Sequence, residues 1–205
     1  MSGRVAIVVG AGGELGRATA EKLAAAGYTV VGVDRSEGTL KELPDGIRRM
    51  TADPADPAAA HSVVDRIAAE VGSPEVLVNT LGTYHLGEAL AATPEDLRLM
   101  IDVNVGAALW LTQAVVPYLR ERGSGSIVHV VARPGLEPAA GMATSAVSKA
   151  AYARLGCAGT GPPSALRRAS MRSPNASSLS KISPQIVPAH SIPGLLRSAV
   201  SSARS

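Results

Sequence analysis

The 205-residue sequence has one cysteine, Cys157, no phenylalanine, and aromatic residues at only 2%. One cysteine excludes an internal disulfide framework and is typical of a reducing compartment, so we expect a cytoplasmic protein. No uninterrupted apolar run approaches the ~20 residues that span a membrane, and no signal-peptide pattern follows Met1, so a membrane protein is not expected. Apolar residues still make up 46% of the chain, which allows a sizeable core of aliphatic side chains.

Acidic residues are absent from the last 50 positions. Residues 156–205 hold 6 of the 20 Lys and Arg, whereas residues 1–155 hold the other 14 together with all 17 acids, a net charge of −3. A basic tail can bind nucleic acid or an anionic membrane by counterion release, but this one has no aromatic residue for base stacking. We therefore expect a domain over residues 1–155, a basic, poorly ordered Ser/Pro-rich tail over residues 156–205, and no nucleic-acid or membrane partner.

The first 155 residues alternate between two kinds of segment. Apolar, β-branched runs predict strands over Arg4–Val9, Thr29–Val33, Gly46–Ala52, Val76–Val78 and Ser126–Val131. Helix formers with capping signals predict helices over Glu14–Ala26, Asp56–Val71, Thr93–Arg122 and Met142–Leu155. Strands that alternate with helices over short links indicate an α/β fold with a doubly wound parallel sheet.

A glycine-rich turn joins the first predicted strand to the first helix, with the sequence Val9-Gly10-Ala11-Gly12-Gly13-Glu14-Leu15-Gly16. Its glycines allow a tight turn and close backbone approach, and the free amides of the helix N-terminus favour a pyrophosphate, as in a Rossmann-type sheet. Asp34 ends the second strand, where a carboxylate accepts hydrogen bonds from a ribose diol and repels a 2′-phosphate. We expect NAD as the cofactor, with NADP less favoured but kept open by Arg35. The residues predicted to contact it are Gly10, Gly12, Gly13, Leu15, Gly16, Asp34 and Arg35.

Five segments over residues 4–155 together resemble the short-chain dehydrogenase/reductase family. The glycine turn is similar to the family's TGxxxGxG, with Glu14 in place of the middle glycine and Val9 in place of the threonine. Asp53 follows the third strand, and Asn79-Thr80-Leu81-Gly82 is similar to the family's NNAG segment. Asn104 matches the asparagine of the catalytic tetrad, and Lys149 the lysine of YxxxK.

The resemblance implies an NAD(P)-dependent oxidoreductase acting on an alcohol/carbonyl pair of a small-molecule substrate, in a homodimer or tetramer. It adds Asp53, Asn79, Gly82 and Lys149 to the cofactor contacts. It also implies that Asn104, Ser145 and Lys149 occupy the catalytic positions.

Two of those positions depart from the family. The proton-donating tyrosine is replaced by Ser145, and the carbonyl-orienting serine by Ala132. A serine hydroxyl is shorter and far less acidic than a phenol, and alanine has no hydrogen-bonding group. We therefore predict weak or absent hydride-transfer catalysis, the alternative being a catalytically silent nucleotide-binding or regulatory protein. A nucleic-acid binder acting through the basic tail is a third possibility.

Other polar residues are weaker candidates for a catalytic role. Tyr152, three residues after Lys149, offers a displaced phenol, although packing is the favoured role. Tyr84 and His85 follow the Asn79–Gly82 segment; His85 offers an acid or base, although a loop histidine facing solvent is the favoured interpretation. His129 alternates out of phase with Ala132 and is expected to point away from the site. No His/Cys/Asp/Glu cluster has metal-ligand spacing, so no metal is expected.

The C-terminal strands of the family are predicted to be missing or degenerate. Ile182–Pro188 comes nearest to a strand, but its prolines cannot donate to a central ladder. The edge of the fifth strand would then remain unpaired. The change of composition near residue 155 favours a frame-shifted or truncated coding sequence, with a genuine divergent segment as the competing account.

Overall fold

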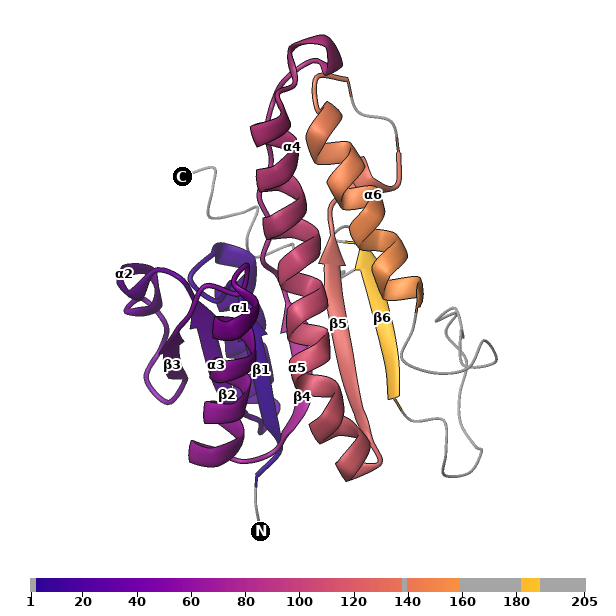
Figure 1. Cartoon of the computed structure of the whole chain (residues 1–205). Helices are drawn as coiled ribbons and strands as arrows, with labels where there is room; N and C mark the ends of the chain where they lie inside the picture. The colour runs from indigo at the N-terminus through magenta and orange to yellow at the C-terminus, as the bar shows by residue number, and fades with distance from the viewer. Residues whose placement is uncertain (1–2, 138–139, 159–181, 189–205) are drawn as a thin grey trace.

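The computed structural model describes residues 3–137, 140–158 and 182–188, and its centre is a parallel sheet (Figure 1). The strands follow the order β3-β2-β1-β4-β5-β6, and every pair of neighbours is parallel. The order reverses between β1 and β4, which creates a crevice at the carboxyl ends of these strands. The predicted α/β, Rossmann-type fold is therefore confirmed. The strands are β1 (Val5–Val9), β2 (Thr29–Asp34), β3 (Arg48–Thr51), β4 (Pro74–Asn79), β5 (Gly125–Val131) and β6 (Ile182–Pro188).

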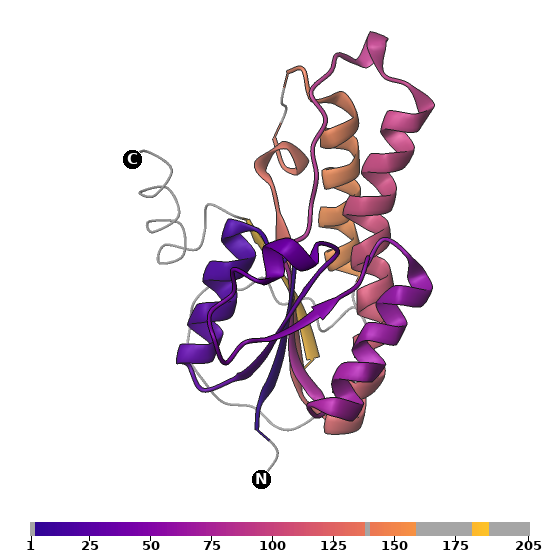
Figure 2. The ribbon, with the colours of Figure 1, turned by 90° about the vertical axis from the view of Figure 1, so that its left-hand side faces the viewer.

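Helices cover both faces of the sheet (Figure 2). They are α1 (Glu14–Ala25), α2 (Glu37–Leu40), α3 (Pro57–Glu70), α4 (Pro94–Ile101), α5 (Ala107–Arg122) and α6 (Ala143–Ala158). Short 3-10 turns occur at Ala89–Ala91 and Arg133–Gly135. Figure 2 places α1 on one side of the sheet, and α3, α5 and α6 on the other.

The strand β1 is buried on both faces, as a central parallel strand requires. Val5, Ile7 and Val9 pack in one core cluster with apolar side chains of α3 and α5. Ala6 and Val8 pack in a second cluster beneath α1 and α2. This alternation explains why the first run of the sequence is apolar at every position rather than at every second one.

Local capping signals set the helix boundaries where the sequence predicted them. The Asp56 carboxylate accepts hydrogen bonds from the amides of the first turn of α3, and Pro57 occupies its first position. Thr93 and Asp96 form a reciprocal capping box at the start of α4. Gly123, with a φ of +69°, ends α5 in the left-handed conformation.

The predicted helix over residues 93–122 is one helical rod with a π segment, Asp102–Gly106, between α4 and α5. By length and composition alone, Pro94–Arg122 is long and apolar enough to cross a membrane. Leu111 and Leu119 of this helix are fully buried in a core cluster with side chains of the sheet. Asn104 lies in the π segment, a local widening that often occurs at functional sites.

The structure corrects the expectation for Ile182–Pro188. This segment pairs in parallel with β5 over its whole length, so the edge of β5 is covered. The two prolines of β6 are four residues apart and thus share one parity in the strand. An edge strand accepts proline where the missing N–H would face away from the ladder. The four-residue helix α2, capped by the Ser36 side chain, was also not predicted.

Candidate functional site

A cavity of about 320 Å³ lies where the chain leaves β4 and β5 and meets α6. Apolar side chains form most of its wall, and the polar groups come from Asn104, Lys149, Tyr84, Tyr152 and two threonines. Its lining comprises Leu15, Thr80, Leu81, Gly82, Thr83, Tyr84, Asn104, Val130, Ala132, Pro134, Met142, Lys149 and Tyr152. A mainly apolar pocket with a few convergent polar groups is the usual form of a small-molecule site.

The glycine turn has the close backbone contacts that its sequence predicted. A Cβ atom on Gly16 would lie 2.0 Å from the Gly10 carbonyl oxygen, so only glycine lets α1 start this close to β1. Gly10 has a φ of +78°, and a Cβ there would lie 2.9 Å from the Leu81 amide nitrogen. Gly13, at the N-cap of α1, provides no side-chain cap, which leaves first-turn amides for a ligand. The turn therefore fits a pyrophosphate, with exposed Glu14 the one unfavourable charge.

Asp34 connects the end of β2 to this turn. Its Oδ2 accepts a hydrogen bond from the Gly12 amide at 3.1 Å, and its Oδ1 accepts one from the Ser36 amide at 3.1 Å. A carboxylate has about four acceptor positions, so both oxygens keep capacity for ribose hydroxyls. Arg35 beside it is exposed. Asp34 is thus half-buried and already ordered, as a ribose-binding carboxylate should be.

Asp53 lies in the turn between β3 and α3. Its Oδ1 accepts a hydrogen bond from the Ala55 amide at 3.0 Å, and the residue is exposed. This contact orders the turn and leaves the second carboxylate oxygen open. Asp53 follows β3, at the same edge of the sheet as Asp34.

Three predicted residues meet around the backbone of Thr83. Asn104 accepts a hydrogen bond from the Thr83 amide at 2.8 Å and donates one to the Thr83 carbonyl at 3.1 Å. The Lys149 Nζ donates to the same carbonyl at 2.7 Å. A Cβ on Gly82 would lie 3.5 Å from Asn104 Oδ1 and 3.9 Å from Lys149 Nζ. The structure therefore brings Asn104, Lys149 and Gly82 together at the cavity wall.

Lys149 is 8% exposed, and burial lowers the pKa of its ammonium group below the usual value. Its one hydrogen bond in the described parts of the chain goes to a carbonyl oxygen rather than to a carboxylate. Within the described parts of the chain, this cavity cation thus has no paired anion. Such a group is suited to a neutral or anionic ligand with oxygen acceptors.

Ser145, which the family resemblance puts at a catalytic position, lies outside the lining of the cavity. It is fully buried, and its hydroxyl accepts a hydrogen bond from the His85 amide at 2.6 Å and donates one to the His85 carbonyl at 2.9 Å. It does not line the cavity, whereas Ala132 does. Ser145 therefore anchors the loop after β4, and no hydroxyl from either departing position faces the cavity.

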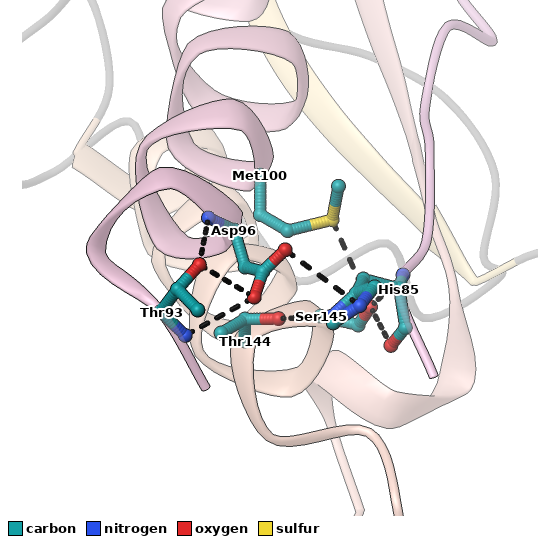
Figure 3. Close-up of polar contacts among 6 residues, drawn as sticks. All are labelled: His85, Thr93, Asp96, Met100, Thr144 and Ser145. Carbon is teal, nitrogen blue, oxygen red and sulfur yellow. Dashed lines mark hydrogen bonds and ion pairs between the residues drawn. The ribbon is translucent and has the colours of Figure 1, made fainter. Parts of the chain in front are cut away.

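The His85 ring lies between two further groups (Figure 3). Its Nε2 is 3.7 Å from Asp96 Oδ1, and its Nδ1 is 3.5 Å from Thr144 Oγ1. Hydrogen bonds from Thr93, and less strongly the nearby imidazole, hold the pKa of Asp96 below its usual value. With a side-chain exposure of 39%, the ring is directed at α4 and α6 rather than free in solvent. Tyr84, in contrast, is 66% exposed at the cavity mouth.

Sequence reasoning missed the connection between Tyr152 and His129. His129 does not line the cavity, as predicted, but its Nδ1 is 3.1 Å from the Tyr152 hydroxyl, which does. The Tyr152 hydroxyl also accepts a hydrogen bond from Asn79 Nδ2 at 3.1 Å. The periodicity of β5 placed His129 on the correct face. No signal in the sequence, however, pairs Tyr152 with His129, 23 positions away, or with Asn79, 73 positions away.

No group of three or more His, Cys, Asp and Glu side chains that could hold a metal occurs among the residues that the structure describes.

Comparisons with known proteins agree with this geometry. The family model described as short chain dehydrogenase matches residues 4–157. The chain is 35% identical over 165 residues to a short chain dehydrogenase of Pseudocercospora fijiensis, covering 76% of this chain and 53% of that protein. It is 30% identical over 152 residues to the 3-oxoacyl-acyl-carrier-protein reductase of Escherichia coli, covering 72% and 62%.

The crystal structure of a short-chain dehydrogenase from Streptomyces avermitilis superposes with a TM-score of 0.72 at 34% identity, over 77% of this chain and 59% of that one. The chain spans less than two thirds of the length of each of these proteins. The family model spans three quarters of the chain, which shows that the chain belongs to the short-chain dehydrogenase/reductase family.

Proposed function

We propose that the protein binds a nicotinamide dinucleotide and is a short-chain-type oxidoreductase for an alcohol/carbonyl pair whose turnover is strongly impaired. One observation carries this proposal. No hydroxyl at position 132 or 145 reaches the cavity, while the N-cap of α1 has no side-chain hydrogen bond and leaves first-turn amides for a dinucleotide.

The first-turn amides of α1 would bind the pyrophosphate, and Asp34 the adenosine ribose. Asp53 is proposed to contact the adenine, and Lys149 the nicotinamide ribose. The bound nicotinamide would supply or accept the hydride. The position of Asp34 favours NAD over NADP, because its charge opposes a 2′-phosphate.

Proton transfer is the step that this chain supports poorly. Lys149 and Asn104 both donate to the Thr83 carbonyl in the cavity wall, and the Lys149 ammonium can polarise a carbonyl oxygen or move a proton through water. The Tyr152 hydroxyl is already in contact with His129 Nδ1 and accepts a hydrogen bond from Asn79 Nδ2, and burial raises its pKa. General acid–base catalysis contributes about 10²–10⁴ in rate, so we expect turnover to be lower by roughly that factor than with a tyrosine acid.

A catalytically silent, nucleotide-binding or regulatory protein is the second candidate. It is favoured by Ser145, whose hydroxyl holds the His85 backbone through two hydrogen bonds and so has a role outside catalysis. The two candidates share dinucleotide binding and differ only in turnover. A small-molecule substrate, a dimeric or tetrameric assembly and a cytoplasmic location remain parts of the same proposal.

The test is calorimetric titration of the full chain with NADH and NADPH, followed by turnover assays on a panel of ketones and alcohols. Binding with slow turnover supports the impaired oxidoreductase, and binding without turnover supports the silent protein. A folded protein that binds neither nucleotide at millimolar concentration contradicts both.

A further inference from the structure

A buried chain of polar side chains runs from the cavity wall into the layer between the sheet and the helices. Asn79 ends β4, Tyr152 lies in α6, His129 lies in β5 and Thr112 lies in α5. The Tyr152 hydroxyl is 3.1 Å from Asn79 Nδ2 and 3.1 Å from His129 Nδ1, and His129 Nε2 is 3.1 Å from Thr112 Oγ1. Asn79 and His129 are each 1% exposed and Tyr152 is 3% exposed. Four elements are thus joined by side chains that exclude water.

Backbone groups at the two ends fix the direction of every hydrogen bond in this chain. At one end the Leu81 amide donates to Asn79 Oδ1 at 3.0 Å, so the Asn79 NH₂ group must face Tyr152. At the other end Thr112 Oγ1 donates to the Ala108 carbonyl at 2.7 Å, which leaves it as the acceptor for His129.

The state of the imidazole follows from these two ends. His129 must carry its proton on Nε2, and its Nδ1 must accept from the Tyr152 hydroxyl. Burial lowers the pKa of His129 to about 4, and its two hydrogen-bond partners, Thr112 and Tyr152, are uncharged, so the neutral ring is the stable form. Every donor then has one acceptor, and no buried side-chain polar atom of the described residues lacks a partner.

The hydrogen-bonded row of side chains ends at the backbone that separates the glycine turn from the cavity. Asn79 holds the Leu81 amide, and the Leu81 nitrogen lies against Gly10, where a Cβ atom would approach it to 2.9 Å. Leu81 and Gly82 also line the cavity. Whatever fixes Asn79 therefore fixes the junction between the glycine turn and the cavity wall.

We propose that Tyr152 and the Nε2-protonated His129 are positioning residues, which hold Asn79 and thereby the Leu81 backbone against the glycine turn for dinucleotide binding. Tyr152 is accordingly not a displaced proton donor. The functional part of this inference rests on the proposed function, while the hydrogen-bond direction does not.

Nuclear magnetic resonance of the full-length protein with ¹⁵N-labelled histidine tests the direction of the hydrogen bonds through His129, and it needs no nucleotide. The expected result is a neutral His129 protonated on Nε2 across pH 5–8, with a slowly exchanging Leu81 amide. Protonation on Nδ1, or titration of His129 within that pH range, would overturn the inference whether or not a nucleotide binds.

Variants test the positioning role. Tyr152→Phe removes the acceptor for Asn79 and the donor to His129, and we expect about a tenfold weaker dinucleotide affinity and faster exchange of the Leu81 amide. Tyr118→Phe is the matched control, because the Tyr118 hydroxyl bonds Asp65 at the surface. His129→Leu is expected to behave as Tyr152→Phe does, whereas His129→Gln restores binding, since an amide can accept from Tyr152 and donate to Thr112.

The outcomes separate the two proposals. A faster Leu81 amide in Tyr152→Phe and His129→Leu, with rescue in His129→Gln, supports the positioning role even if the parent chain binds no nucleotide, a result that would contradict the proposed function alone. Equal Leu81 exchange in the folded parent, Tyr152→Phe and Tyr118→Phe proteins would overturn the positioning role. The positioning role would also be overturned if Leu81 exchange in His129→Gln were as fast as in His129→Leu.

Discussion

The two sides of the proposed dinucleotide site use different materials. From β1 to α2, the ligand-facing groups are backbone amides and one carboxylate, held by glycines that permit close contact. From β4 to α6, the corresponding surface depends on side chains from four elements, among them Asn104, Lys149 and Tyr152. The first side tolerates no added atoms at Gly10 and Gly16, whereas the second depends on complete hydrogen bonding. We therefore expect the first side to be disrupted by steric clashes and the second by the loss of single hydrogen bonds.

The largest effect is expected on the backbone side. In Gly16→Ala, the new Cβ would lie 2.0 Å from the Gly10 carbonyl oxygen and 2.8 Å from Ala11 Cα, both backbone atoms that cannot yield by a rotamer change. We expect a loss of more than about 3 kcal/mol in the free energy of unfolding, measured by urea denaturation, and no detectable nucleotide binding. Gly13→Ala, with its nearest neighbour 3.5 Å away, should lose less than about 1 kcal/mol. Equal stability of the two variants would contradict the close-contact account.

The stability of the side from β4 to α6 should depend more on acid pH than that of the side from β1 to α2. Burial lowers the pKa of His129 to about 4, against 6.5 in an unfolded chain, so the unfolded state binds more protons between these values. Stability therefore falls as the pH drops from 6.5 to 4, by about 3 kcal/mol from this residue. Unfolding of the wild-type protein and His129→Gln should diverge over that window only. Parallel pH profiles of the two proteins would show that His129 is not buried in its neutral form.

The same contrast explains which features the sequence could predict. The glycine turn, Asp34 and the caps at Asp56 and Thr93 depend on local spacing, so a single segment contains their whole signal. The pairing of Ser145 with His85, 60 positions away, has no such signal, because alignment assigns a position and not a contact. The strand β6 was missed because proline is unfavourable in a ladder, a penalty that an edge position with suitable parity removes.

A smaller effect concerns nucleotide preference on the backbone side. Asp34→Asn keeps the shape of the side chain but removes its charge and one acceptor for the Gly12 and Ser36 amides. We expect the ratio of NADH to NADPH affinity to fall about tenfold, or about 1.4 kcal/mol, because repulsion of a 2′-phosphate disappears. Calorimetric titration with both nucleotides measures this ratio, with exposed Glu37→Gln as the control. An unchanged ratio would remove Asp34 from the ribose site.

The smallest effect is expected at the loop after β4, where the second side can be loosened without a steric clash. Ser145→Ala removes both hydrogen bonds to the His85 backbone, while the isolated bridge between Gly87 and Met142 still holds the loop. We expect a loss of about 1 kcal/mol in stability and faster hydrogen exchange at the His85 amide. Val147→Ala, on an exposed position of the same helix, should change neither quantity.

Since Ser145 does not line the cavity, the nucleotide affinity of Ser145→Ala should differ from that of the wild-type protein by less than about twofold. Lys149→Ala removes a cavity cation and should weaken nucleotide affinity more. A large loss of affinity in Ser145→Ala alone would mean that the loop, rather than the cavity wall, sets the geometry of this half of the site.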